Sequence, residues 1–254
     1  HRTLVEAAGD GVELAAAGGI VEDLRTVKDD EEIAAIRASA ALADAALLAV
    51  LERGLAGRTE REVATDLEIE MRRAGAQAIA FPPIVASGAH GALPHAEPRD
   101  VKIPGGVLVT IDWGAELDGY CSDCTRTFAT GEVGSTEREV YELVLAAEEA
   151  ALVAARAGMS SRDLDSVARE LIGASGHGER FGHGLGHGVG IEVHEGPRLS
   201  QRSDEELRAG QVVTIEPGVY LPGVCGVRIE DLVVLGPGAA ELLTGLPKQL
   251  QTIV

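Results

Sequence analysis

The chain repeats one short pattern about a hundred residues apart, and this repeat constrains its fold more than any other feature. Residues 109–119 read VTIDWGAELDG and residues 213–223 read VTIEPGVYLPG, an offset of 104. Upstream, GRTEREV at 57–63 matches GMSSRDL at 158–164, an offset of 101. Two matches in the same order predict two related halves, which usually pack about a pseudo-twofold axis. The alternative is coincidence, because V-T-I is ordinary strand sequence.

The hydrophobic pattern gives each half two helices followed by a hairpin of strands. The helices are expected at residues 29–54, 60–74, 136–156 and 161–174, and the strands at 107–113, 121–128, 211–216 and 227–235. Thr59 with Glu62 spells a capping box at the start of the second helix. The predicted fold class is therefore α+β, with two pseudo-symmetric helix–helix–hairpin halves at about 29–130 and 136–235 and an antiparallel sheet covered by helices.

Charge and composition exclude some classes of function. The net charge of −19 argues against a nucleic-acid partner. The longest apolar run, Ala45–Leu51, is far shorter than the ~18 residues of a membrane span, so no membrane partner is expected. Three cysteines do not make a disulfide framework, which favours a reducing compartment and a cytoplasmic location. The C-x-x-C of Cys121 and Cys124 lacks the second pair of a zinc knuckle and is interpreted as two small strand residues.

The repeat also indicates where the chemistry lies. Each half places one carboxylate at the end of an apolar strand, Asp112 in the first half and Glu216 in the second. Each half then supplies another on the return strand, Asp123 and Glu230. Ionised groups beside strand cores are costly unless they are paired or bound to a cation. Four carboxylates near one axis would repel one another, and two divalent ions would balance their charge.

A histidine- and glycine-rich stretch at 182–197, GHGLGHGVGIEVHEGP, supplies the remaining donors. Alternating glycines disfavour a helix, so extended or looped backbone is expected, with the glycines allowing a bound peptide to lie alongside. One of the three imidazoles (His183, His187 or His194) would complete five metal ligands, and the other two would contact substrate. An oxygen-rich set with one imidazole and no thiolate suits Mn²⁺, Co²⁺ or Zn²⁺.

Together these motifs resemble the pita-bread (M24-type) metallopeptidases. The resemblance rests on D-x10-D, GHGLGHGVGIEVHE, TIEPG and VRIED, and it extends from about Val21 to Leu235. It implies a pita-bread fold and two divalent ions, with Mn²⁺ preferred and Co²⁺ or Zn²⁺ as alternatives. The metal ligands that it implies are Asp112, Asp123, His187, Glu216 and Glu230, of which Asp123 and Glu230 bridge the two ions.

Within this family, the sequence is most similar to the branch that cleaves Xaa-Pro bonds. Methionine aminopeptidases typically lack the extra histidine four residues before the ligand, here His183, and the arginine two residues before the last ligand, here Arg228. The phrase LPHAEP at 93–98, which contains His95, is also similar to the Xaa-Pro branch. The expected function is a dinuclear metal-dependent exopeptidase that removes the residue before a proline, acting on short proline-containing peptides.

The resemblance also implies roles for residues around the metal ions. Glu216 is expected to shuttle a proton between the attacking water and the leaving nitrogen. His194 and His95 are expected to hydrogen-bond the scissile carbonyl oxygen and the substrate backbone. His183 is expected to shape the proline pocket, and Arg228 to orient the metal ligands through a charge-assisted hydrogen bond.

The remaining predictions concern the N-terminal segment and two residues outside the expected ligand set. In the Xaa-Pro branch an N-terminal domain usually precedes the catalytic domain, so residues 1–22 are predicted to be a linker remnant and residues 23–254 the metallopeptidase domain. His90 stands where relatives often have asparagine, and no role is assigned to it. Glu195 is expected to be solvated.

Three functions therefore compete. The first is an Xaa-Pro peptidase, with aminopeptidase and dipeptidase action left open. The second is a methionine aminopeptidase, and the third is a catalytically silent peptide-binding module on the same fold. A homodimer is expected for the full-length form.

Overall fold

The computed structural model describes residues 2–8, 12, 14, 15 and 17–254. The first helices are α1 (Arg2–Ala8) and α2 (Ile20–Thr26). The proposed linker at 1–22 falls partly outside the described residues, and its assignment stays a prediction.

Each half of the chain contains two long helices and then strands, as the repeat predicts. The first half contains α3 (Asp30–Leu51), α4 (Glu60–Arg73), β1 (Ala78–Ile79), β2 (Ile84–Ser87), the 3₁₀ helix η1 (Gly88–Ala92), β3 (Leu108–Trp113), β4 (Ala115–Leu117), β5 (Tyr120–Cys121) and β6 (Cys124–Ala129). The second half contains α5 (Ser135–Ala154), α6 (Ser161–Ala174), the 3₁₀ helix η2 (Gly178–Arg180), β7 (Gly186–Gly188), β8 (Glu195–Leu199), β9 (Val212–Ile215), β10 (Gly218–Leu221), β11 (Cys225–Arg228), β12 (Asp231–Val234) and β13 (Glu241–Leu242).

The two helices of the first half begin at reciprocal caps. Thr59 accepts a hydrogen bond from the backbone of Glu62, whose side chain accepts one from the backbone of Thr59, so the predicted capping box is confirmed. Asp29 and Glu32 make the same arrangement at the start of α3. Each box satisfies backbone N–H groups that the first helical turn leaves without partners.

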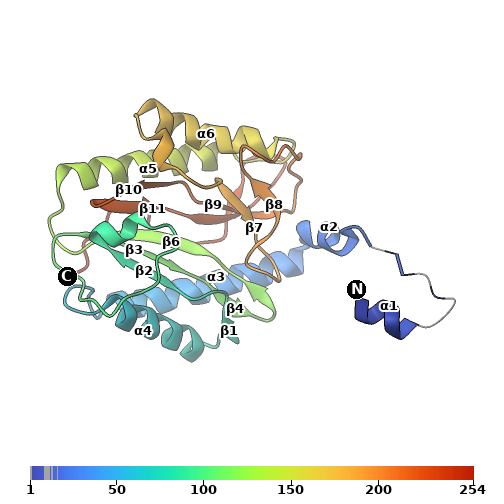
Figure 1. Ribbon diagram of the computed structural model, residues 1–254, viewed down its shortest axis with the longest axis horizontal. Coiled ribbons are helices and arrows are strands. Elements are labelled where there is room, and N and C mark those ends of the chain that lie inside the picture. The colour runs from blue at the N-terminus through green and yellow to red at the C-terminus, as the bar shows by residue number, and fades with distance from the viewer. Residues whose placement is uncertain (1, 9–11, 13, 16) are drawn as a thin grey trace.

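The strands lie between the two helix pairs, with α3 and α4 on one side and α5 and α6 on the other (Figure 1). Strand β3 pairs antiparallel with both β2 and β6, and β12 pairs antiparallel with β9. Each half also has its own hydrophobic core. Val109 and Ile111 of β3 pack with α3 and α4, whereas Val213 and Ile215 of β9 pack with α5 and α6. This is the α+β arrangement that the sequence predicts.

Helix α3 departs from one expectation. Its 22 residues are long and apolar enough, by length and composition, to cross a membrane, so the expectation that no segment approaches such a span is wrong. The core helix of a globular protein passes the same test, and α3 packs against the first-half core through fully buried Leu47 and Val50. It also buries a carboxyl group, that of Asp44.

The return strand of each half is broken where a carboxylate was expected. Residues 121–128 divide into β5, which pairs with β4, and β6, which pairs with β3, and Asp123 lies at the break. In the second half β11 pairs with β10 and β12 with β9, and Glu230 lies at that break. The continuous strands expected at these two places are therefore wrong. In both halves the strand changes partners at the carboxylate, which directs that side chain out of the regular ladder.

The two halves meet along β6 and β11. Thr127 Oγ1 donates to the carbonyl of Arg228 and accepts from its backbone N–H, at 2.9 and 3.2 Å. Thr125 and Glu230 form an isolated antiparallel bridge beside them. This seam brings the two strand breaks next to each other.

Candidate metal centre

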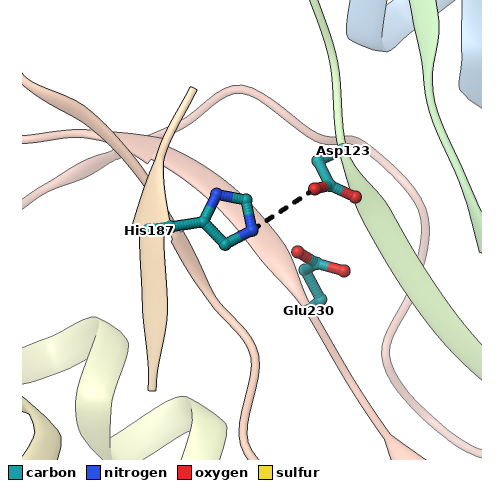
Figure 2. A group of neighbouring side chains, drawn as sticks. All are labelled: Asp123, His187 and Glu230. Atoms are coloured by element: carbon teal, nitrogen blue, oxygen red, sulfur yellow. Dashed lines mark ion pairs between the residues drawn. The ribbon is translucent and has the colours of Figure 1, made fainter. Parts of the chain in front are cut away.

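Three predicted ligands from distant parts of the chain converge at the seam. One donor atom from each of Asp123, His187 and Glu230 lies within 4.8 Å of the others, and all three residues are buried. Figure 2 shows the two carboxylates directed toward the imidazole of His187, which lies on β7. The distance from His187 Nε2 to Asp123 Oδ2 is 3.6 Å. Two carboxylates and an imidazole so close together form a plausible set of metal ligands.

The other two predicted ligands lie beside this cluster. Glu216 follows β9, and its Oε1 is 3.3 Å from His187 Nε2. Asp112, on β3, accepts a hydrogen bond through Oδ2 from Arg228 Nη2 at 2.6 Å. Its other oxygen, Oδ1, is buried and has no hydrogen-bond partner among the described residues. A buried carboxylate oxygen without a partner is costly, and a bound cation would satisfy it.

The pKa shifts describe a site with too much negative charge for its own partners. Burial raises the pKa of Asp123 and Glu230 well above the usual range, and the neighbouring carboxylates raise both further. Burial also raises the pKa of Asp112, against the opposing charge of Arg228. Burial would raise the pKa of Glu216 as well, but the hydrogen bond and charge of His187 outweigh it and lower that pKa to about 2. A divalent cation would relieve the repulsion, so these residues fit a metal site.

The imidazole of His187 is oriented for coordination by its own backbone. Its Nδ1 is 3.1 Å from the carbonyl oxygen of Gly188, which can only accept a hydrogen bond. Nδ1 therefore donates to this carbonyl. The other nitrogen, Nε2, faces the carboxylates, donates to Glu216 in the metal-free protein and would lose its proton on binding a metal ion. Metal-binding histidines commonly have their second nitrogen fixed in this way.

The alternating glycines have a different role from the one expected. A side chain on Gly186 would collide with Thr214 of β9, and one on Gly188 would collide with the backbone of Gly196. The close neighbours of these two glycines are therefore strands of the protein itself rather than a bound peptide. The prediction that the glycines make room for a peptide is wrong at these positions, and their smallness instead brings His187 into the site.

A single cavity of about 720 Å³ opens over this cluster. All nine site residues named from the sequence line it: Asp112, Asp123, His187, Glu216, Glu230, His95, His183, His194 and Arg228. The structure thus brings the whole set together, while the individual roles stay predictions. The ring of His194 lies 4.3 Å from that of His187, centroid to centroid.

The sequence profile of metallopeptidase family M24 matches residues 34–237 of the chain. The chain belongs to metallopeptidase family M24. The family resemblance inferred from the sequence motifs is thereby confirmed.

Individual M24 relatives cover most of the chain. An Xaa-Pro dipeptidase from Pyrococcus furiosus is 46% identical over 231 residues, which are 91% of this chain and 66% of the relative. The crystal structure of an X-Pro aminopeptidase from Thermotoga maritima has a TM-score of 0.95 and 44% identity, and the match covers 100% of this chain and 71% of that one. A prolidase structure from Pyrococcus furiosus has a TM-score of 0.93 and 43% identity, covering 98% and 74%. The pita-bread fold is therefore confirmed, and the chain spans 66% of the length of the curated dipeptidase.

Tyr220 belongs to this M24 site but was not identified from the sequence. The hydroxyl of Tyr220 accepts from Arg228 Nη1 at 3.0 Å and lies 2.9 Å from His183 Nε2. His183 Nδ1 is 2.8 Å from the carbonyl of Gly184, so Nδ1 carries the proton and Nε2 accepts from Tyr220. Burial lowers the pKa of His183, which favours this neutral form. Tyr220 lies in the repeat opposite Glu116, and no local pattern marks it as part of a site.

Glu195 is not solvated, contrary to expectation. Its carboxylate binds Lys28 Nζ at 2.6 Å and Arg25 Nη2 at 2.7 Å, and its side chain is 7% exposed. Both cations come from the entry to the M24 domain, about 170 residues earlier in the chain. The sequence signal for this pairing is the pair of cations Arg25 and Lys28, which are three residues apart.

Proposed function

We propose that the chain is the catalytic part of a dinuclear metal-dependent exopeptidase that removes the residue preceding a proline. The observation that carries this proposal is the convergence of Asp123, His187 and Glu230 at the floor of a cavity that also holds Asp112 and Glu216. Membership of M24 and similarity to an Xaa-Pro dipeptidase support the reaction and the substrate class.

Two divalent ions bound by these five residues would supply a water of lowered pKa and polarise the scissile carbonyl. The protein's own groups define the rest of the site. Glu216 is the proposed proton shuttle, because its carboxylate lies among the ligands with one oxygen 3.1 Å from Thr214 Oγ1. That hydroxyl and His187 hold the carboxylate in one orientation.

The remaining side chains orient ligands and substrate. Arg228 holds Asp112 by a charge-assisted hydrogen bond, which is the role proposed for it from the sequence. The neutral His183 is held by Tyr220 and stacks edge-on against Phe181, with ring centroids 5.1 Å apart. His183 lines the cavity, and so does Phe81, so we propose that these two rings contact the proline ring of the substrate. His95 and His194 line the same cavity, and we propose that they donate hydrogen bonds to the substrate carbonyl and backbone.

Peptide hydrolysis by the metal-loaded protein tests the proposal against its rivals. We expect rapid cleavage of Ala-Pro or Ala-Pro-Ala in the presence of Mn²⁺ and slow cleavage of Met-Ala-Ser. Fast cleavage of Met-Ala-Ser alone would support a methionine aminopeptidase. A metal-loaded protein that binds peptides but cleaves none of them would support a silent binding module. The intact set of five donors argues against that third function.

We propose a dipeptide rather than a longer peptide as the substrate, and one arginine supports this choice. Arg198 lines the cavity, and its guanidinium has no hydrogen bond or ion pair among the described residues. A free arginine near the proline site suits the terminal carboxylate of a dipeptide, because guanidinium binds carboxylate bidentately. Arg169, which also lines the cavity, is already paired with Asp165 at 2.7 and 2.8 Å.

Ala-Pro and its C-terminal amide test this choice, since they differ only in the carboxylate. We expect Arg198→Met to raise KM for Ala-Pro while KM for Ala-Pro amide stays the same. Arg202 also lines the cavity and has no guanidinium partner among the described residues, so Arg202→Met tests it as the alternative partner of the carboxylate on the same two substrates. An equal effect of Arg198→Met on both substrates would overturn the assignment to a dipeptidase.

We also propose Mn²⁺ as the preferred metal, a homodimer for the full-length protein and a cytoplasmic location. The donor set of four carboxylates and one imidazole supports Mn²⁺, Co²⁺ or Zn²⁺. Metal analysis of purified protein would test the first proposal, sedimentation of the full-length chain the second, and cell fractionation the third.

A further inference from the structure

The segment that carries His95 has little regular structure of its own. It leaves β2 at Ser87, forms the short 3₁₀ helix η1, and continues without helix or strand through Arg99. His95 is exposed at the cavity. A histidine that binds substrate must be held to within a fraction of an ångström, and a misplacement of about 1 Å can lower a rate about 100-fold. The segment 87–99 therefore needs anchors elsewhere in the protein.

One buried carboxylate supplies most of these anchors. Glu60, in the first turn of α4, has a fully buried side chain. It accepts hydrogen bonds from the backbone and the hydroxyl of Ser87 at 2.9 and 2.7 Å. It also accepts from Arg99 through the backbone N–H and two guanidinium nitrogens, at 3.0 to 3.1 Å. Glu60 thus joins the two ends of the segment.

The middle of the segment reaches the same carboxylate through His90. His90 Nδ1 lies 3.0 Å from Glu60 Oε2, and because an ionised carboxylate only accepts, Nδ1 carries the proton. Burial would raise the pKa of Glu60, but the hydrogen bonds from Arg99 and Ser87 outweigh it and lower that pKa to about 2. Glu60 is therefore ionised at neutral pH.

The other side of the segment rests on the second half of the protein. Gly91 and Gly226 pack backbone against backbone, so closely that a side chain on Gly226 would collide with the carbonyl of Gly91. Arg228 Nη1 donates to the carbonyl of Pro94 at 3.1 Å. The residue before His95 is thus tied to the arginine that also holds Asp112. Glu60 on one side and β11 on the other hold the segment between them.

We propose that Glu60, acting through Arg99 and His90, is a positioning residue that fixes His95 at the cavity. This inference rests on the proposed function, in which His95 contacts substrate. It gives a role to His90, to which no sequence motif assigns one. Glu60 itself touches neither the cavity nor the predicted ligands.

Two substitutions remove parts of this anchor without emptying the core. Arg99→Met removes the guanidinium, whose side chain is 44% exposed, and Glu60→Gln removes the charge while keeping the shape. We expect either variant to lower kcat/KM for Ala-Pro about 10- to 100-fold with unchanged metal content. Asp66→Asn is the matched control. Asp66 is on the same helix as Glu60, and its substitution breaks ion pairs with Arg53 and Arg58, which lie outside the segment 87–99. We expect its kcat/KM to stay the same.

His90 offers a conservative variant for rescue. His90→Asn keeps a side-chain N–H that can donate to Glu60, whereas His90→Leu does not. We expect His90→Asn to retain the wild-type kcat/KM and His90→Leu to lose several-fold. Equal losses in both variants would show that the hydrogen bond to Glu60 is not what matters.

Hydrogen exchange gives a readout that is independent of turnover. In the metal-free protein, we expect Arg99→Met and Glu60→Gln to speed amide exchange in residues 87–99 and to leave exchange in α5 and α6 unchanged. Unchanged exchange in 87–99 would overturn the inference, whatever happens to the activity. Uniformly faster exchange would also overturn it, by indicating general destabilisation.

A double-substitution cycle separates this inference from the proposed function. If His95→Ala lowers kcat/KM and Arg99→Met has no further effect in that background, Arg99 acts through His95 as proposed. If both substitutions lower kcat/KM and their effects multiply, the positioning role is wrong and the proposed function stands. If His95→Ala leaves kcat/KM unchanged, the role of His95 in the proposed function fails, and this inference fails with it.

Discussion

Strand β6 and the start of β12 lie side by side, and charged side chains are buried on both of their faces. The two faces differ in whether the buried carboxyl groups have cations beside them. Thr125 and Arg126 are consecutive on β6, and Glu230 immediately precedes Asp231, the first residue of β12. Consecutive residues of an extended chain point to opposite faces. On the cavity face Thr125 Oγ1 donates to Glu230 Oε2 at 2.6 Å. On the opposite face Arg126 Nη2 donates to Asp231 Oδ1, also at 2.6 Å.

The face away from the cavity balances its own charge. Asp231 also binds Lys248 Nζ at 2.7 Å, and Lys248 lies 3.4 Å from Glu148 of α5. Two cations thus meet two carboxyl groups. Burial would raise the pKa of Asp231, but the charges of Arg126 and Lys248 outweigh it and lower the pKa below the usual range. On this face each carboxyl group has a cation within 4 Å, although both oxygens of Glu148 lack a hydrogen bond among the described residues.

The cavity face does not balance its charge. It gathers four carboxyl groups around one imidazole, and Arg228 forms an ion pair with one of them, Asp112. The pKa of Asp123 is raised, first by burial and then by Glu230 and other acids. Buried charge by itself therefore does not mark a functional site, because both faces have it. An excess of one sign, left for a ligand to neutralise, distinguishes the cavity face.

The largest expected effect separates activity from stability on the cavity face. Asp123→Asn removes a proposed bridging ligand, and we expect kcat/KM for Ala-Pro to fall about 1000-fold or more, equivalent to ~4 kcal/mol of transition-state stabilisation. The metal-free variant should be at least as stable to urea as the metal-free wild type, because one repelling charge is gone. Peptide assays and urea unfolding of the same samples measure both. A variant that is active, or one that is much less stable, would break the comparison.

The opposite face should respond in the reverse way. Arg126→Met leaves Asp231 buried with less opposing charge, and losing one partner of a buried ion pair costs about 3–5 kcal/mol. We expect the free energy of unfolding in urea to fall by about that amount. Arg37→Met is the control, because its partner Glu241 is exposed and such pairs contribute little. A loss no greater than that of the control would show that the buried network contributes little to stability.

Metal addition should stabilise through the cavity face alone. Mn²⁺ at 100 times its dissociation constant stabilises a protein that binds it only when folded by about 2.7 kcal/mol. We expect the melting temperature of the wild type to rise with Mn²⁺ and to return to its metal-free value with a chelator. Glu230→Gln should lose most of this rise in melting temperature. Arg126→Met should show the same rise, although its metal-free melting temperature is lower than that of the wild type. An equal response in Glu230→Gln and wild type would exclude Glu230 as a ligand.

The sequence predicted the parts of the molecule that depend on local pattern. The capping box of Thr59 and Glu62 and the helices of both halves follow from residues close together in the chain. The candidate ligands were found because the duplication repeats a carboxylate at the end of an apolar strand. The breaks at Asp123 and Glu230 were missed because strand-forming residues continue on both sides of each break. Only the change of pairing partner, a tertiary event, interrupts the ladder.

The missed residues have partners far away in the sequence. Glu60 has the pattern of an ordinary acidic residue at a helix start, yet its partners Ser87 and Arg99 lie 27 and 39 residues later. Glu195 pairs with Lys28 across 167 residues. The sequence does not distinguish a buried carboxylate from a solvated one. The fold determines which of them lies beside a cation. Side chains that support a site are thus harder to predict than those that form it.

The smallest expected effect concerns a carboxyl group at the margin of the balanced face. Burial, with the nearby charge of Asp231, raises the pKa of Glu148 to about 9, although Lys248 and Arg126 oppose the shift. In the unfolded chain a glutamate titrates near 4.3. Between these values the folded state keeps a proton that the unfolded state has lost, so this group makes stability fall as pH rises from about 5 toward 9. Glu148→Gln cannot ionise and should remove that contribution.

We therefore expect the free energy of unfolding of Glu148→Gln, measured relative to that of the wild type, to increase from pH 6 to pH 8. The increase should be less than about 1.4 kcal/mol per pH unit. Glu149→Gln, at the next and exposed position of α5, is the control and should follow the wild type. Urea unfolding at the two pH values, with the metal removed, measures the difference. If Glu148→Gln instead followed the wild type across this pH range, Glu148 would be ionised in the folded protein. The face away from the cavity would then hold two carboxylates against two cations, and it would differ from the cavity face only in its larger share of cations.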